Sequence, residues 1–124
     1  MEENVFGKAL KPCCDSTVTG FTRSGYCEVP PGDLGNHSVC AVVTEDFLAF
    51  TRLRGNDLST PMPHHGFPGL KQGDRWCLCA NRWLEAYEAG FAPPVVLEST
   101  NKKALQIIEL EVLKKHQFSG VLES

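Results

Sequence analysis

The stretch that decides the fold reads Gly73-Asp74-Arg75-Trp76-Cys77-Leu78-Cys79-Ala80-Asn81. Apolar side chains alternate with other residues from Arg75 to Ala80, and a period of two predicts a strand. Asn81 follows with a side-chain oxygen that can cap a helix. The expected helix carries its apolar side chains near one side, at Trp83, Leu84, Tyr87 and Phe91, and ends at Gly90 and Pro93-Pro94. A strand therefore leads directly into a helix here.

A second strand–helix unit precedes this one. Val39–Val43 is a continuous apolar run, compatible with a strand that is buried on both faces. Thr44 offers an N-cap hydroxyl, and two acidic residues follow where the first turn of a helix favours them. The buried stripe of this helix is expected at Phe47, Phe50 and Leu53. Gly55 is a natural C-terminal stop.

The rest of the chain predicts a hairpin and a terminal helix. Residues 94–97 and 104–108 are expected to be strands, joined through the polar run 99–103. Residues 110–116 fit a short helix. The element order predicts an α+β fold, in which a small mixed or antiparallel sheet has helices packed on one face as a two-layer sandwich. Long Pro/Gly-rich loops complete it, among them residues 55–74.

Length and charge limit the class of protein. The 124 residues suit one domain, 1–124, with a loop-rich N-terminal region (1–36), an α+β core (37–118) and a tail (119–124). The 12 basic and 15 acidic residues give a net charge of −3, which argues against nucleic-acid binding. No apolar run approaches membrane-spanning length, and the N-terminus lacks a signal-peptide pattern. We therefore expect a cytoplasmic protein without a membrane partner, whose thiols stay reduced unless catalytic or metal-bound.

Cys77 and Cys79 lie two residues apart in the expected strand, so their sulfurs should share a face. His37 and Cys40 lie at the other predicted strand, and the four could together form a Cys₃His zinc site. Simple burial of these cysteines in the core is the favoured interpretation, because free cysteine behaves as a small apolar residue. Metal binding and thiol chemistry are the alternatives.

Cys13, Cys14 and Cys27 are the thiol candidates. They lie in the loop-rich N-terminal region, where exposure is more common, and Lys11 is close enough in sequence to favour a thiolate. Adjacent cysteines rarely bond each other, so Cys27 is the plausible disulfide partner of Cys13 or Cys14. The alternative is that all three are incidental thiols.

Five polar residues form a candidate ligand site at the ends of the long loop. Charged residues at such junctions are common in binding sites, since a rigid scaffold then presents a flexible edge. Arginine could hold a carboxylate or phosphate, and aspartate could orient it or act as a base. The structural interpretation, which we favour, is an ion-pair network with turn-forming side chains. The five residues are Arg54, Asn56, Asp57, Asp74 and Arg75.

Several of these segments resemble a family of short, mostly bacterial, single-domain proteins known only as a conserved domain of unknown function. The matching stretches include Gly35-x-His37-x-x-Cys40-Ala41, residues 54–61 and Gly73-Asp74-Arg75-Trp76-Cys77-Leu78-Cys79. Others are Pro12-Cys13, Thr19-Gly20-Phe21, Phe67-Pro68-Gly69-Leu70 and residues 92–97. The resemblance implies a two-layer α+β fold and a soluble intracellular protein, and it implies no reaction. The chain departs from the family in its Cys13-Cys14 doublet and in Tyr26-Cys27, where relatives have a single cysteine and a cysteine pair.

Two functions follow as hypotheses. The first is a small non-catalytic binding or interaction module, stabilised by zinc or another metal through Cys and His, with a small molecule or a protein as partner. The second is a small enzyme that uses an activated thiol or the Arg/Asp group at the long loop. The first is preferred, because common nucleotide-binding and hydrolase motifs are missing from the sequence.

Overall fold

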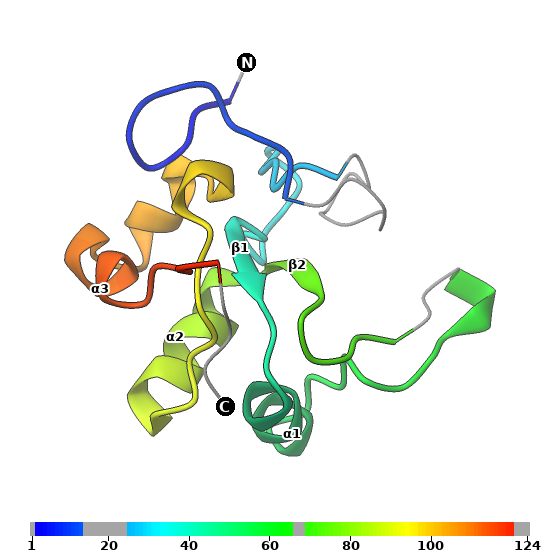
Figure 1. Ribbon diagram of the computed structural model, residues 1–124. Coiled ribbons are helices and arrows are strands. Elements are labelled where there is room, and N and C mark those ends of the chain that lie inside the picture. The colour runs from blue at the N-terminus through cyan, green and yellow to red at the C-terminus, as the bar shows by residue number, and fades with distance from the viewer. Residues whose placement is uncertain (1, 14–24, 66–68, 121–124) are drawn as a thin grey trace.

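The centre of the protein is a two-stranded antiparallel sheet (Figure 1). In this computed structural model the described residues are 2–13, 25–65 and 69–120. Strand β1, Val39–Val42, pairs with β2, Arg75–Leu78, and Cys40 lies directly opposite Cys77. Three helices accompany the sheet, so the predicted small α+β fold is confirmed.

Helix α1, Glu45–Leu53, follows β1 as the sequence predicts. The Thr44 hydroxyl accepts a hydrogen bond from the Phe47 amide at 3.1 Å, which satisfies one of the free N–H groups of the first turn. Phe47 is fully buried and Leu48 is nearly so, whereas Leu53 is 86% exposed. The predicted buried stripe of α1 is therefore wrong at Leu53. Leu48 lies in the core instead.

Helix α2, Ala80–Ala89, has its N-cap two residues earlier than predicted, at Cys79 instead of Asn81. Cys79 is the N-cap, because its carbonyl oxygen already accepts from the amides of Arg82 and Trp83. Asn81 is therefore inside the helix, and the strand ends before Cys79. The helix ends at Gly90, as predicted, in a left-handed conformation with φ of 86°.

The predicted hairpin does not form. Residues 97–99 and 102–106 are two 3₁₀ turns, η2 (Leu97–Ser99) and η3 (Lys102–Gln106). The Asn101 side chain accepts from the Lys103 amide at 2.9 Å and caps η3. Such local bonds offer the backbone an alternative to a ladder. The terminal helix α3, Leu110–Lys115, is confirmed.

The two faces of the sheet contact different partners. Val39, Ala41 and Leu78 join the main apolar core with Phe47 of α1 and Trp83 of α2. Cys40 and Cys77 project to the opposite face, because side chains alternate along a strand. There the chain before β1 covers them (Figure 1). The sheet is thus enclosed between helices and the N-terminal segment, defined here as the described residues before β1.

No helix within the described ranges is long and apolar enough to cross a membrane.

Candidate functional site

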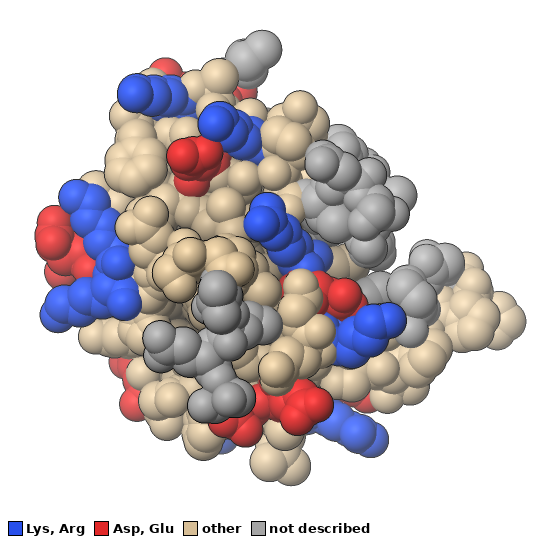
Figure 2. All heavy atoms as spheres, viewed as in Figure 1, with Lys and Arg blue, Asp and Glu red and all other residues tan. Residues whose placement is uncertain are grey.

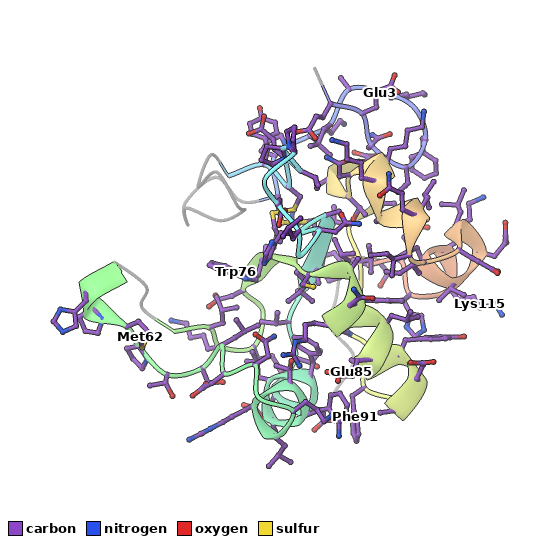
Figure 3. The ribbon with its side chains drawn as sticks, turned by 180° about the vertical axis from the view of Figure 1, so that it is seen from behind. Glu3, Met62, Trp76, Glu85, Phe91 and Lys115 are labelled. Carbon is purple, nitrogen blue, oxygen red and sulfur yellow. A yellow bond between two sulfur atoms is a disulfide. The ribbon has the colours of Figure 1, made fainter. Side chains whose placement is uncertain are left out.

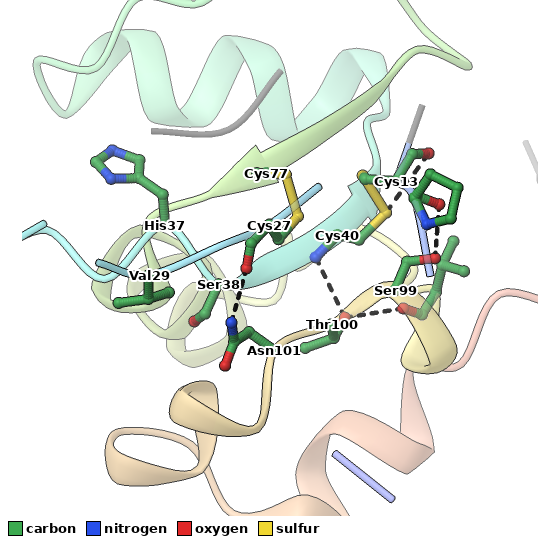
Figure 4. Close-up of a disulfide and its surroundings, with 12 residues drawn as sticks. Cys13, Cys27, Val29, His37, Ser38, Cys40, Cys77, Ser99, Thr100 and Asn101 are labelled. Carbon is green, nitrogen blue, oxygen red and sulfur yellow. Dashed lines mark hydrogen bonds between the residues drawn. A yellow bond between two sulfur atoms is a disulfide. The ribbon is translucent and has the colours of Figure 1, made fainter. Parts of the chain in front are cut away.

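Four cysteines meet on the face of the sheet that the N-terminal segment covers (Figure 4). All are at most 1% exposed, and Val96 packs against them. The sulfurs of Cys13, Cys27 and Cys77 lie within 4.8 Å of one another, and Cys40 is bonded to Cys13. We call Cys13, Cys27, Cys40 and Cys77 the cysteine cluster.

The cluster contains two disulfides. Cys13 is bonded to Cys40 and Cys27 to Cys77, with Cα–Cα distances of 5.6 and 5.3 Å. The expected pairing of Cys27 with Cys13 or Cys14 is therefore wrong, as is the expected exposure of Cys13 and Cys27. Each cysteine of the N-terminal segment instead reaches a strand cysteine across the sheet face. Cys14 lies outside the described residues.

A network of hydrogen bonds holds the N-terminal segment beside the cluster. The Asn101 side-chain amide donates to the carbonyl oxygen of Cys27 at 2.9 Å and to the carboxylate of Glu2 at 3.1 Å. The Thr100 hydroxyl accepts from the Cys40 amide at 3.2 Å, and the Ser99 hydroxyl donates to the Pro12 carbonyl at 2.9 Å. Residues 99–101, which the sequence presents as a polar link, therefore attach the N-terminal segment to the sheet.

The predicted zinc ligands His37, Cys40, Cys77 and Cys79 are not gathered at one point. Cys40 and Cys77 belong to the disulfides, and Cys79 is a free cysteine at the start of α2. The Nδ1 of His37 lies 2.7 Å from a carboxylate oxygen of the buried Asp33, to which it can donate a hydrogen bond, and Figure 4 shows its ring turned away from the sulfurs. Within the described ranges, the group of three or more potential metal ligands is Cys13, Cys27 and Cys77.

The described residues of the long loop, 56–65 and 69–72, form an arm that projects from the molecule (Figure 2). Its two limbs are joined near the base, where the Leu70 amide donates to the Leu58 carbonyl at 2.7 Å. Figure 3 places Met62 at the far end of the arm, away from Trp76 and Phe91. Met62 is 47% exposed.

Two of the predicted ligand-binding residues shape the base of the arm. The Asn56 side chain donates to the Thr51 hydroxyl at 3.0 Å, at the end of α1. Asp57 accepts from the amides of Ser59 and Thr60 and from the Thr60 hydroxyl. The Thr60 hydroxyl, followed by the Ser59 amide, holds the pKa of Asp57 below its usual 3.8. Both side chains therefore serve as turn-forming groups.

The other three predicted ligand-binding residues also have structural partners. Arg54 lies 3.3 Å from Glu85 of α2. Asp74 accepts from the Lys71 amide at 3.0 Å and closes the turn that leads into β2. The guanidinium of Arg75 lies 5.9 Å from the ring centroid of Phe118. Each of the five residues thus has a partner within the chain, and their role in ligand binding stays a prediction.

A groove of about 760 Å³ lies between α1 and the base of the arm. Leu48 and Leu70, both nearly buried, contribute apolar surface, and Leu53 stands exposed at its edge. Arg52 and Lys71 are charged residues of the rim. From the sequence, none of these residues is assigned to a binding site, and Leu53 is expected in the core. The signal that could have found the groove was the length of the loop, together with an apolar residue at position 53.

A family model described as an uncharacterised protein conserved in bacteria (DUF2237) matches residues 3–117. This match spans nearly the whole chain, including the cysteine cluster, α1 and the arm. No curated protein matches the chain.

Proposed function

Because the chain belongs to the DUF2237 family of uncharacterised proteins, whose description carries no activity, we propose from the geometry that it is a non-catalytic protein-binding module. Its binding surface is the groove between α1 and the arm. The observation that carries this proposal is an apolar groove that lies between the exposed Leu53 and the base of the arm.

The groove has the make-up of a docking surface. Leu48, Ala49, Leu53 and Leu70 give it apolar walls, and large exposed apolar side chains beside a concavity are typical of interaction sites. Leu53 is 86% exposed, so a partner that covers it gains free energy from burial of apolar area. An interaction of this kind needs no catalytic group.

We infer that the occupant is a short acidic segment of another protein with large apolar side chains. The rim contains two cations, Arg52 and Lys71, and one carboxylate, Glu45. Arg52 is only weakly engaged within the chain, since its nitrogen lies 3.8 Å from the Asp57 carboxylate. An acidic segment is therefore complementary to the rim, and a basic one is not.

A peptide titration tests the proposal. The probe is an acetylated peptide of alternating leucine and glutamate, added to isotope-labelled full-length chain and followed through backbone amide shifts. We expect saturable shifts at Leu48, Leu53 and Lys71, and an affinity that weakens as salt is raised. The same peptide with lysine in place of glutamate is the control for charge. Equal binding of both peptides, or shifts confined to another surface, would refute the assignment.

Two leucine substitutions distinguish binding in the groove from nonspecific binding to exposed apolar side chains. Leu53→Ser removes the exposed apolar group at the groove, whereas Leu34→Ser removes an equally exposed one elsewhere. Both side chains are more than 80% exposed, so neither change should alter folding. Only Leu53→Ser should weaken binding of the acidic peptide.

The enzyme hypothesis gains no support from the arrangement of its residues. In the described ranges, Arg54, Asp74 and Arg75 contact other residues of the chain, and Cys13 and Cys27 are bonded to other cysteines. A cytoplasmic location stays a prediction. Two buried disulfides are more typical of oxidising compartments, so the redox state of the cysteine cluster in cells is the measurement that bears on it.

A further inference from the structure

We propose that the cysteine cluster, when reduced, is a tetrahedral zinc site made of Cys13, Cys27, Cys40 and Cys77. This site differs from the one predicted from the sequence and is independent of the groove. It replaces His37 and Cys79 by two cysteines of the N-terminal segment.

The sulfurs of the cysteine cluster converge. Three of them already lie within 4.8 Å of one another, and the fourth is bonded to one of these three. Four thiolates at about 2.3 Å from a zinc ion are separated from one another by about 3.8 Å in a regular tetrahedron. That arrangement requires the two sulfur–sulfur bonds to break, the bonded sulfurs to move apart by roughly one to two ångströms, and the Cys40 sulfur to approach those of Cys27 and Cys77.

The backbone presents the four cysteines from two sides of the cluster. Cys40 and Cys77 are opposite each other in the register of the sheet, so they offer two ligands from a rigid frame. Cys13 and Cys27 come from the segment that covers this face. The Cys27 carbonyl is held by Asn101 and the Cys40 amide by Thr100, bonds that do not depend on the state of the sulfurs. Such outer contacts orient ligands in metal sites.

The cysteine cluster is also buried. Every one of its cysteines is at most 1% exposed, and Val96 is its apolar neighbour. Four neutral thiols would fit such a site, but four buried cysteines gathered on one face of a sheet match a common structural zinc composition. Zinc would then connect the N-terminal segment to the sheet at the same positions as the two disulfides.

A dithiol serves as the reductant of the two disulfides. Two dithiol molecules each transfer two electrons and two protons to one disulfide and themselves become cyclic disulfides. The four resulting thiols release four protons to the buffer as they bind Zn²⁺, which leaves a site of net charge −2. Zinc affinity must therefore fall as the pH is lowered.

The test uses the full-length chain, reduced under inert gas and then titrated with zinc chloride alone. Native mass spectrometry should show one zinc per chain. Cobalt(II) in place of zinc should give the thiolate charge-transfer band and the intense visible bands of a tetrahedral centre. Uptake of no metal by the reduced chain would overturn the proposal.

Alkylation identifies the ligands without any substitution. Zinc should protect Cys13, Cys27, Cys40 and Cys77 from iodoacetamide, and Cys79, which is partly exposed, should react with or without zinc. Protection of Cys79 together with Cys40 and Cys77, but not of Cys27, would instead identify the set predicted from the sequence.

Matched variants complete the test. Cys27→Ser removes a ligand of the proposed site only, and should lower zinc affinity by about 100-fold or more, since even outer partners of metal sites are worth about 10–100-fold. Cys79→Ser and His37→Ala each remove a ligand of the zinc site predicted from the sequence and none of the proposed site. Both variants should therefore bind zinc as tightly as the unsubstituted chain does. The reverse pattern would refute the proposed ligands.

Discussion

Cys40 and Cys77 face each other across the paired strands, and each is bonded to a different cysteine of the N-terminal segment. Two neighbouring positions of the sheet are thereby tied to points 14 residues apart in the segment before it (27 − 13 = 14). The sheet has two strands in the described part of the chain, and this attachment covers the face that the helices leave open.

Removal of either disulfide should destabilise the oxidised protein. In the chain-entropy model, loops of 27 and 50 residues correspond to about 3.5 and about 4.1 kcal/mol. We expect losses of about 2–4 kcal/mol in the free energy of unfolding for Cys13→Ser/Cys40→Ser and for Cys27→Ser/Cys77→Ser, with the second slightly larger. Urea unfolding without reductant measures this. Cys79→Ser is the control and should lose little; equal stability of all three variants would contradict the prediction.

Asn101→Ala should cost about 1–3 kcal/mol, because it leaves the Cys27 carbonyl and the Lys103 amide without their partner in a buried site. Asn101 is 1% exposed. Thermal unfolding of the oxidised chain is the measurement. The matched control is Asn81→Ala, an exposed asparagine within α2, for which we expect a change of no more than about 0.5 kcal/mol. Similar effects of the two changes would show that the link from η3 to the N-terminal segment does not contribute to stability.

Gly69→Ala should disturb the arm. Gly69 has φ of 82°, and an added Cβ would collide with the carbonyl oxygen of Ser59. Gly7 has a similar φ of 76° but open space around it, so Gly7→Ala isolates the conformational cost, about 1 kcal/mol. We expect a larger loss for Gly69→Ala, together with amide shift changes at Leu58 and Leu70. An effect no greater than that of Gly7→Ala would show that the two limbs of the arm separate easily.

Stability should fall on acidification near neutral pH because of His116. The ring lies 5.4 Å from the rings of both Trp83 and Tyr87, and burial, followed by the charge of Lys115, lowers the pKa of His116 below 6.5. A lowered pKa means that the unfolded chain binds the proton more readily, so stability is lost as the pH falls through the window just below 6.5. Urea unfolding between about pH 7.5 and about pH 5 measures the slope. His116→Phe should reduce it, whereas His64→Phe, an exposed site on the arm, should leave it unchanged.

Local signals predicted most of the regular elements. Thr44 caps α1 and Gly90 ends α2, because each of these signals depends on neighbours in sequence. The apolar run at 39–43 and the alternating stretch at 75–80 likewise contain the strands β1 and β2. The start of α2 was misplaced since Cys79, although it continues the alternation, already accepts helical hydrogen bonds. The apolar run at 95–97 is typical of a strand. In the structure, Val95 forms isolated bridges with Ala41 and Gln117 and is not part of the predicted hairpin.

The cysteine cluster could be predicted only incompletely. Cys40 and Cys77 were expected on strands, which is correct, but their partners depend on how a segment without regular structure crosses the sheet. Spacing alone does not determine disulfide connectivity, since four cysteines allow three pairings. The groove was missed for a related reason, because its walls come from α1 and from a loop without periodicity.

The two disulfides also interleave along the chain, 13 with 40 and 27 with 77, so neither loop is nested within the other. As a consequence, a single proteolytic cut anywhere between Cys13 and Cys77 leaves both pieces in one molecule. The arm lies between Cys13 and Cys77 in the sequence, so a cut within it leaves the two pieces linked. A protease that nicks it would produce two bands on a reducing gel and one on a non-reducing gel, and the nicked chain would keep its mass apart from one added water.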